Sequence, residues 1–391
     1  MVKIVECSGT HFQMGFTQGK ETRYMLENAY RVMREFSIRW KVKPRFVPFR
    51  LLVELGGIYY GSKLNSLLKL KMKNQHERLK GISKGSGLRE SHLQFMQAVE
   101  ILSGWYDHSK TKHGVTPTLY AQTTGATKGC TSFAVEKQKS KTRKIIAAKN
   151  YDFPNEFEDA QIVRKNYPVN KFSSIDFTEA PLAGHHNGMN EHGLVALYTY
   201  VSNTEKTFSV PLTILLQEVL ENCKNVDEAI KFIEKAPRGN GGNILLADTE
   251  KVVVVETSPS SCEVRLPKNG FIVSTNHYIT EKMKRFSLPD DYVYPTTIPD
   301  RTWHNVLFKE NSEIRFDWTL NYLNEHLLVD IADFKKILRS HGSDNKPNIN
   351  TVCKHTNAAS TLGSVIFVPE DRKMFVVKGK PCEKEYTELT L

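Results

Sequence analysis

Gly129-Cys130-Thr131-Ser132-Phe133-Ala134-Val135 and Ile145-Ile146-Ala147-Ala148-Lys149-Asn150-Tyr151-Asp152-Phe153 are two apolar runs separated by a polar segment. That segment contains five basic side chains, namely Lys137, Lys139, Lys141, Arg143 and Lys144. Apolar, β-branched runs on either side of a polar loop predict a β-hairpin. Because a hairpin brings its two outer ends together, we expect Cys130 to lie near Asn150 and Asp152.

The Gly129–Cys130 peptide bond is a candidate for self-cleavage. Gly129 lets the backbone before the cysteine adopt conformations closed to other residues. The thiol of Cys130 could then attack the preceding carbonyl, and water would release a new amino terminus on Cys130. A terminal amine with a pKa of roughly 7.7–8.0 can serve as the base for the thiol on the same residue. The alternative is a small buried cysteine in a strand.

Several motifs resemble one family. Gly-Cys-Thr-Ser-Phe followed by Asn-Tyr-Asp-Phe resembles the processing site of peptidase family C45. These are the acyl-coenzyme A:6-aminopenicillanate acyltransferase-like N-terminal nucleophile (Ntn) hydrolases, relatives of choloylglycine hydrolases. The opening glycines, the Asn-Glu-His-Gly turn, the Ser-Thr-Asn-His strand end and the carboxyl terminus are also similar to this family; these are residues 9–19, 190–193, 274–277 and 352–383. The resemblance implies a precursor, or zymogen, that cleaves itself between Gly129 and Cys130.

The sequence divides at the same point. Helical patterns over residues 21–40, 47–80 and 90–105 make residues 1–129 mainly helical, and a polar linker is expected over residues 109–128. Residues 130–391 contain at least eight predicted strands with helices grouped between them, which predicts an α+β fold with antiparallel sheets. The family resemblance implies a more specific fold, a four-layer αββα sandwich. It also implies that segment 1–129 is cleaved but retained beside the catalytic segment 130–391.

The resemblance also assigns site residues. Cys130 is the expected nucleophile, Asp152 orients its amine, and Asn276 stabilises the oxyanion, although spacing alone would equally allow a turn asparagine. Tyr200 aligns with an oxyanion asparagine of the choloylglycine relatives, and Lys149 aligns with their active-site arginine. The expected substrate-binding residues are Lys149, Tyr151, Tyr200 and His277.

Composition excludes several other classes. The net charge is +11, but no recognition motif accompanies the lysines, so a solvated basic surface is favoured over nucleic-acid binding. No apolar run reaches a membrane span and no signal-peptide core opens the sequence, so a cytoplasmic location without membrane contact is expected. The six cysteines lack paired or zinc-finger spacing, so neither a disulfide scaffold nor a metal site is expected. The glycine-rich loop 239–242 precedes a strand, which argues against a nucleotide cradle.

The expected function is therefore a self-processing cysteine amidohydrolase or acyltransferase without a cofactor. Its substrate would be a linear amide or thioester of a small acyl donor, and a coenzyme A thioester fits as a substrate. One alternative is an uncleaved cysteine hydrolase with His355 or His277 as the base. The other is a non-enzymatic protein that binds anions or nucleic acid through the loop of residues 137–144. The oligomeric state, including a homo-oligomer, stays open.

Overall fold

Two β-sheets form the centre of the molecule. The computed structural model describes residues 2–39, 49–103, 129–294 and 298–391. The eight-stranded sheet has the order β1 (Lys3–Gly9), β4 (Gln161–Pro168), β5 (Ser174–Glu179), β6 (Asn187–Asn190), β7 (Val195–Tyr200), β8 (Gly242–Ala247), β9 (Val252–Thr257) and β10 (Cys262–Arg265). The six-stranded sheet has the order β11 (Phe271–Ser274), β2 (Thr131–Val135), β3 (Ile146–Pro154), β12 (Ala359–Val368), β13 (Lys373–Lys378) and β14 (Thr387–Thr390).

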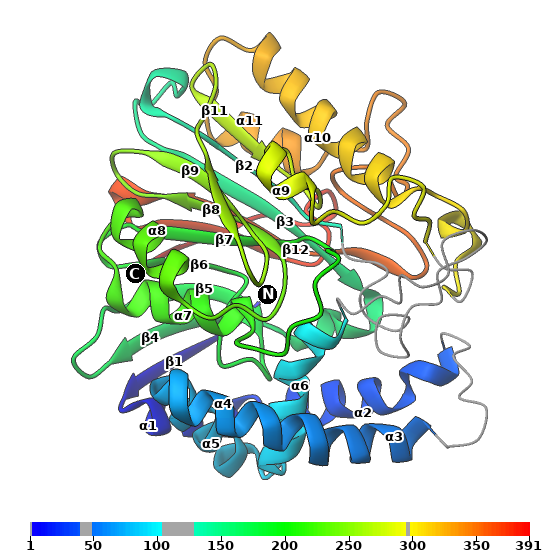
Figure 1. Cartoon of the computed structure of the whole chain (residues 1–391). Helices are drawn as coiled ribbons and strands as arrows, with labels where there is room; N and C mark the ends of the chain where they lie inside the picture. The colour runs from blue at the N-terminus through cyan, green and yellow to red at the C-terminus, as the bar shows by residue number, and fades with distance from the viewer. Residues whose placement is uncertain (1, 40–48, 104–128, 295–297) are drawn as a thin grey trace.

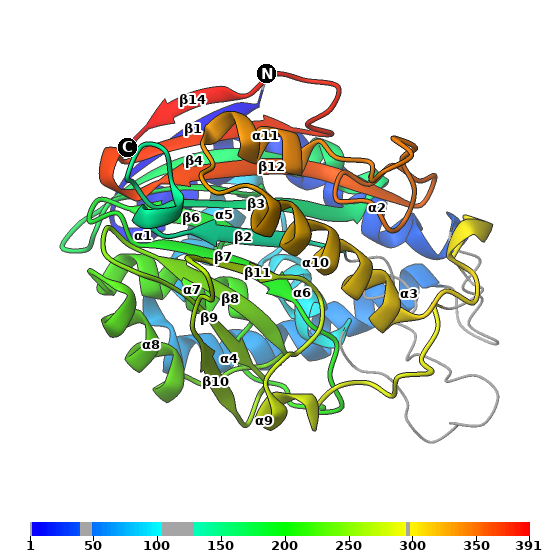
Figure 2. The ribbon, with the colours of Figure 1, turned by 90° about the horizontal axis from the view of Figure 1, so that it is seen from above.

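Helices cover the outer faces of both sheets (Figures 1 and 2). Helices α7 (Leu212–Asn222) and α8 (Val226–Lys235) pack on the eight-stranded sheet. Helices α10 (Phe308–Glu325) and α11 (Ile331–Leu338) pack on the six-stranded sheet. Between the sheets lies an apolar layer that includes Phe177, Leu245 and Phe367, all fully buried. The layer order is α, β, β, α, which confirms the predicted α+β sandwich.

Strand pairing is antiparallel with one exception. Strand β1 pairs in parallel with β4, with Lys3 opposite Ile162. All other pairings between the named strands are antiparallel. The amino-terminal segment therefore supplies an edge strand of the larger sheet.

The helices of the amino-terminal segment gather on one side of the sandwich (blue and cyan in Figure 1). They are α1 (His11–Glu21), α2 (Arg23–Arg39), α3 (Phe49–Gly56), a π-helical turn (Gly57–Gly61), α4 (Ser62–Lys71), α5 (Lys73–Ser86) and α6 (Glu90–Leu102). The predicted helix over 47–80 is thus divided into shorter helices. A Cβ on Gly15 would lie 2.0 Å from the backbone oxygen of Arg78, so the opening glycines allow α1 and α5 to pack closely. The predicted linker 109–128 lies outside the described residues.

The predicted hairpin is formed by β2 and β3. Thr131 lies opposite Asn150, and Val135 lies opposite Ile146. Gly129 and Cys130 directly precede β2, so they lie beside the part of β3 that contains Tyr151 and Asp152. Strand β11 extends the hairpin on the other side of β2, with Ser274 opposite Ser132. Cys130 and the end of β11 are therefore close neighbours, although they are distant in the sequence.

Other predicted elements are confirmed with shifted ends. The predicted helix 90–105 ends at Leu102, and the predicted strand 193–201 corresponds to β7 (Val195–Tyr200). Helix α11 begins after Asp330, whose carboxylate accepts hydrogen bonds from the backbone of Ala332 and Asp333, as a capping residue does. Among the described residues, no helix combines the length and apolarity needed to cross a bilayer.

Candidate active site

Cys130 lines a cavity between the amino-terminal helices and the sandwich. Its side chain is nearly fully buried, with 3% of the residue exposed. Most of the lining is apolar and comes from both parts of the chain: Ala29, Met33, Met96, Val99, Tyr151, Phe153, Phe157, Pro181, Leu182, Tyr198 and Tyr200. The polar members are Glu100, Cys130, Asp152, Glu179 and His186. The thiol thus adjoins a largely apolar space.

Asp152 and Lys354 form a buried ion pair beside Gly129. Oδ2 of Asp152 lies 3.7 Å from Nζ of Lys354, and both side chains have no exposed surface. Oδ1 of Asp152 accepts a 2.7 Å hydrogen bond from the hydroxyl of Thr361. A Cβ on Gly129 would lie 2.1 Å from Nζ of Lys354 and 3.3 Å from Oδ2 of Asp152. Only glycine fits at position 129 without displacing this pair.

Burial dominates the titration of both partners. Burial raises the pKa of Asp152, and the positive charges of Lys354 and Arg315 oppose that rise. Burial, together with the charge of Arg315, lowers the pKa of Lys354 to about 7 against the attraction of Asp152. Burial therefore disfavours the charged form of both groups, and their mutual attraction opposes it.

Arg315 connects the start of β2 to the end of β11. One guanidinium nitrogen donates to the carbonyl oxygen of Cys130 at 2.5 Å and to Oγ1 of Thr131 at 3.2 Å. The other donates to Oδ1 of Asn276 at 2.9 Å and to Oδ1 of Asn311 at 3.2 Å. This forked geometry is specific to arginine. It fixes the backbone of the candidate nucleophile relative to Asn276.

Asn276 follows β11 and is held from both ends of its amide. Oδ1 accepts from Arg315, and Nδ2 donates to the backbone oxygen of Tyr200 at 2.7 Å. Its backbone N–H donates to the hydroxyl of Ser312 at 2.7 Å. An amide nitrogen carries two hydrogens, so Nδ2 has capacity for a second acceptor. Tyr200 contributes its carbonyl to Asn276 and its side chain to the cavity wall.

Lys149 and Tyr151 differ in their access to the cavity. Tyr151 lines it and donates its hydroxyl to Oε1 of Glu179 at 2.8 Å. Lys149 is fully buried, donates to the backbone oxygen of Tyr198, and holds its ammonium 5.3 Å from the centre of the Tyr151 ring. Burial lowers the pKa of Lys149, whereas the negative forms of Cys130 and Asp152 would raise it. The ammonium of Lys149 lies behind the wall and does not line the cavity.

Neither of the two histidines considered as alternative bases lines the cavity of Cys130. His277 forms hydrogen bonds through Nδ1 to Ser312 and Thr275, and it lines a second cavity with Asn276 and Phe316. Burial and the charge of Arg315 lower the pKa of His277 to about 3. Nε2 of His355 faces the sulfur atoms of Cys353 and Cys382. Within the described ranges, neither histidine is hydrogen-bonded to Cys130.

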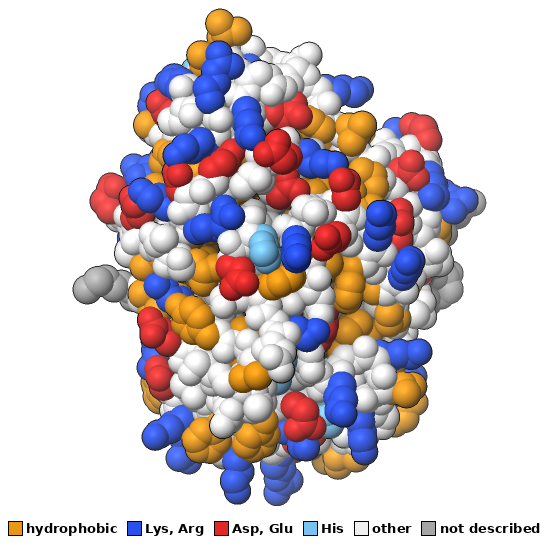
Figure 3. All heavy atoms as spheres, turned by 90° about the vertical axis from the view of Figure 1, so that its left-hand side faces the viewer, with side chains coloured by type: hydrophobic (Ala, Val, Ile, Leu, Met, Phe, Trp, Pro, Cys, Tyr) orange, Lys and Arg blue, Asp and Glu red, His pale blue; other side chains and the backbone are white. Residues whose placement is uncertain are grey.

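The basic loop between β2 and β3 is largely neutralised. Lys137 pairs with Glu250 at 3.3 Å, Lys141 with Asp333 at 2.9 Å, and Lys144 with Asp371 at 2.5 Å. Lys139 is buried, and its ammonium lies 5.4 Å from the ring centre of Phe271. Basic and acidic side chains are also interspersed on the face of the molecule in Figure 3. These contacts weigh against an anion-binding patch on this loop.

A site role for Arg315, Lys354 or His186 was not expected from the sequence. Arg315 lies on the buried face of α10 with Asn311, Ser312, Thr319 and Leu323. Four of those five buried side chains are polar, so a search for an apolar face points away from it. His186 belongs to the cavity wall, and its ring centre lies 4.7 Å from that of Tyr151. The helical spacing of these buried residues along α10 is the feature of the sequence that could have indicated that Arg315 faces the interior.

A protein family and several solved structures are similar to this chain. Residues 137–383, more than half of the chain, match the model of the acyl-coenzyme A:6-aminopenicillanic acid acyl-transferase family. A search of curated protein sequences found no match.

Three of the solved structures that are similar to this chain illustrate the likeness. One is the Caenorhabditis elegans ortholog of N-acylethanolamine-hydrolyzing acid amidase, with a TM-score of 0.43, 17% identity, and coverage of 61% of this chain and 93% of that chain. A second is a mutant of conjugated bile acid hydrolase from Clostridium perfringens, with a TM-score of 0.40, 15% identity, and coverage of 67% and 97%. A third is penicillin V acylase from Agrobacterium tumefaciens, with a TM-score of 0.38, 17% identity, and coverage of 64% and 83%.

Proposed function

Because this chain belongs to the acyl-coenzyme A:6-aminopenicillanic acid acyl-transferase family, we propose that it is an enzyme that uses Cys130 to transfer an acyl group from an amide or thioester. The acyl group passes to water or to an amine. The observation that carries the proposal is the position of Cys130: its thiol adjoins an apolar cavity, and the preceding Gly129 lies against the buried Asp152–Lys354 pair.

The first step is self-processing of the precursor. Sγ of Cys130 attacks the carbonyl carbon of Gly129, and the bond from that carbon to the nitrogen of Cys130 breaks after the nitrogen gains a proton. The product is a thioester between Gly129 and Cys130. Water then hydrolyses the thioester, which releases the carboxylate of Gly129 and leaves a free thiol and a free α-amine on Cys130. The polar contacts of Arg315 with the carbonyl of Cys130 support a fixed backbone for this attack.

The mature enzyme uses the new amine as a base. The α-amine of Cys130 takes the thiol proton, and the thiolate attacks the carbonyl carbon of the substrate. The leaving group departs with that proton, so a thioester remains on the enzyme. The carboxylate of Asp152 adjoins Gly129 and would orient the amine. Water, or an amine acceptor, then resolves the thioester and restores the thiol.

Asn276 is the proposed donor to the oxyanion. Arg315 and the carbonyl of Tyr200 hold its amide in one orientation. A donor fixed before the reaction stabilises the developing charge without reorganisation, and the loss of one such donor costs roughly 3–4 kcal/mol. Lys149, behind the cavity wall, would contribute positive charge near Cys130 rather than contact the substrate.

The acyl group is proposed to be apolar and uncharged. The cavity wall beside Cys130 consists mainly of methionine, valine, leucine and aromatic side chains. Its polar members include three carboxyl side chains, those of Glu100, Asp152 and Glu179, which would repel an acidic acyl group. Tyr151, Tyr200 and the apolar wall would bind the acyl chain. A coenzyme A thioester enters the proposal as an acyl donor whose charged portion stays outside this cavity.

The amino-terminal segment is proposed to stay bound after cleavage. Five lining residues of the cavity come from this segment: Ala29, Met33, Met96, Val99 and Glu100. Buried polar contacts also cross between the two parts: Nη2 of Arg78 donates to Oδ1 of Asn166 at 2.6 Å. Separation would expose these groups and one edge of the eight-stranded sheet. Retention therefore completes the substrate site.

Intact mass spectrometry of the purified protein tests the proposal. Wild type should give two chains, residues 1–129 and residues 130–391, whose masses sum to that of the precursor plus one water. The two chains should elute together in size-exclusion chromatography. Cys130→Ala should remain one chain and lack turnover of chromogenic amides with apolar acyl groups.

Two other outcomes would each decide against part of the proposal. A wild type that stays uncleaved but turns over amides in a Cys130-dependent manner would support an uncleaved cysteine hydrolase. Steep salt-dependent binding to nucleic acid without turnover would support the binding-protein alternative.

A further inference from the structure

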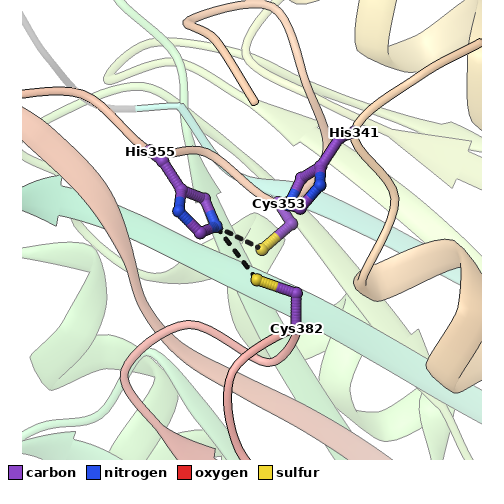
Figure 4. Close-up of side chains that lie close together, drawn as sticks. All are labelled: His341, Cys353, His355 and Cys382. Carbon is purple, nitrogen blue, oxygen red and sulfur yellow. Dashed lines mark hydrogen bonds between the residues drawn. The ribbon is translucent and has the colours of Figure 1, made fainter. Parts of the chain in front are cut away.

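Four potential metal ligands converge at one end of the six-stranded sheet, outside the cavity of Cys130. They are His341, Cys353, His355 and Cys382 (Figure 4). His341 follows helix α11, Cys353 and His355 lie in the segment before β12, and Cys382 lies between β13 and β14. One nitrogen or sulfur atom from each residue falls within 4.8 Å of all the others. From this arrangement we propose a zinc site with two thiolate and two imidazole ligands.

The separations of the ligand atoms are close to those around a tetrahedral ion. Nε2 of His355 lies 3.4 Å from Sγ of Cys353 and 3.1 Å from Sγ of Cys382. Zinc bonds of about 2.0–2.3 Å place tetrahedral ligand atoms roughly 3.3–3.8 Å apart. Only small side-chain movements would bring the four atoms to these separations. Two thiolates with two imidazoles also select zinc over magnesium or calcium, which prefer oxygen ligands.

The hydrogen-bonding of the cluster also favours a shared metal ligand set. Nε2 of His341 is buried and has no hydrogen-bond partner among the described residues. The sulfur atoms of Cys353 and Cys382 both face Nε2 of His355. A ring nitrogen forms only one well-aligned hydrogen bond, so it cannot satisfy both sulfur atoms. A cation at the centre would satisfy all of these atoms together.

A carboxylate completes the second layer of contacts. Oε1 of Glu383 lies 3.6 Å from Nδ1 of His355, on the side of the ring away from the sulfur atoms. Zinc-bound histidines commonly direct their other nitrogen to a carboxylate, which fixes the tautomer that binds the metal. Binding would release one proton from each of Cys353 and Cys382. The two thiolates then balance the charge of Zn²⁺.

The surrounding backbone holds the ligands in place without the metal. The N–H of Cys353 donates to the carbonyl of Ser340 at 2.9 Å. Nε of Arg339 donates to the carbonyl of Pro381 at 2.8 Å. These contacts join the three segments that carry the ligands. A metal ion would therefore bind an arranged site and would stabilise the folded chain in proportion to its affinity.

The site also flanks Lys354. Cys353 and His355 are its two neighbours in the chain, and its ammonium points toward Asp152 and Gly129. A metal bound to both neighbours would fix the backbone that carries this ammonium. The proposed zinc is therefore structural, and it positions Lys354 beside the proposed cleavage point. The zinc content of the protein can be measured without any assay of enzyme activity.

Metal analysis of the full chain tests the site. Protein purified with a thiol reductant and without chelator should contain one zinc per chain. Cys382→Ser and His341→Ala should each contain about a tenth of that or less, because each removes one of four ligands. Cys262→Ser, a cysteine on β10, should retain the full amount. Cobalt in place of zinc should give the thiolate-to-metal absorption of a tetrahedral site.

A second measurement covers variants that fold poorly. The melting temperature of wild type should fall when zinc is removed by a chelator and recover on addition of Zn²⁺ but not of Mg²⁺. A disulfide between Cys353 and Cys382 is the competing arrangement. If the reduced wild type binds no zinc, or if His341→Ala binds as much as wild type, the proposal is overturned.

Discussion

The ammonium of Lys354 lies 3.7 Å from the carboxylate of Asp152, and both side chains are fully buried. The two residues are separated by about two hundred positions in the sequence. They meet because β3 and β12 are neighbours, with Thr361 opposite Asp152. The pair adjoins Gly129, so a charge change here would act directly on the proposed cleavage site.

Asp152→Asn tests whether this charge is needed for processing. We expect slow or absent cleavage, together with a loss of stability on the order of 3–5 kcal/mol, because Lys354 is left buried without its partner. The double variant Asp152→Asn/Lys354→Met removes both charges and should recover stability but not cleavage. Thermal melts and gel analysis measure the two effects separately.

Thr361→Val is the matched control, since it removes the hydrogen bond to Asp152 and keeps the charge. Normal cleavage in the double variant would rule out an essential role for the carboxylate.

Arg315→Lys tests the fork that joins Cys130 to Asn276. A lysine keeps the positive charge, but it cannot reach the acceptors on Cys130, Thr131, Asn276 and Asn311 together. We expect kcat to fall by about two orders of magnitude or more and guanidinium ion to restore part of the rate in Arg315→Ala. Steady-state kinetics with and without guanidinium measure this. Full activity in Arg315→Lys would show that charge alone suffices.

Asn276→Ala tests the proposed oxyanion donor. We expect kcat to fall by about two to three orders of magnitude with a much smaller change in KM. Slow acylation of Cys130 by a reactive ester should persist, because the thiol and amine remain.

Ser312→Ala serves as the control for Asn276→Ala, since it removes the hydroxyl bonded to the backbone of Asn276 but leaves the amide. A rise in KM at constant kcat would identify Asn276 as a substrate-binding residue instead.

Val99→Phe tests the acyl cavity and the role of the amino-terminal segment. Val99 lies on α6 and lines the cavity, so a larger side chain should shorten the space for the acyl chain. We expect kcat/KM for long acyl chains to fall by about tenfold or more, with short chains less affected. A series of amides of increasing chain length measures this. An unchanged chain-length profile would mean that the acyl group binds elsewhere.

Glu218 provides a pH-dependent prediction at the contact between the two segments. Burial and the neighbouring charge of Glu221 raise the pKa of Glu218 from 4.5 to about 7. The folded chain holds the proton of Glu218 more tightly than the unfolded chain does. The contribution of this proton to the free energy of unfolding is therefore fully present below about pH 4.5 and is lost as the pH rises to about 7. Glu218→Gln has no proton to lose.

We therefore expect Glu218→Gln to melt at a higher temperature than wild type above pH 7 and at a similar temperature near pH 4.5. Glu234→Gln, an exposed position on α8, should change neither value. A Glu218→Gln protein that is less stable than wild type in alkaline buffer would contradict this prediction.

The sequence predicted the layers of the fold and the candidate nucleophile. Alternating and continuous apolar runs identified the β2–β3 hairpin, because burial of one or both faces of a strand leaves a local pattern. The same register brought Cys130 and Asp152 to one end of the hairpin. Helix ends and the breaks within residues 47–80 were less well predicted, because glycines and packing contacts decide them.

The remaining polar partners depend on contacts between distant segments. Arg315 and Lys354 are buried charges, and their sequence neighbourhoods resemble exposed polar positions. His341, Cys353, His355 and Cys382 have no metal-binding spacing, yet loops at one end of the six-stranded sheet bring them together. Local sequence determined the strands and the hairpin, since these depend on backbone preference and burial. It also marked the Gly129–Cys130 bond as a candidate for cleavage. Only the tertiary structure decided the electrostatic partners, because each buried charge is held by groups from segments distant in the sequence.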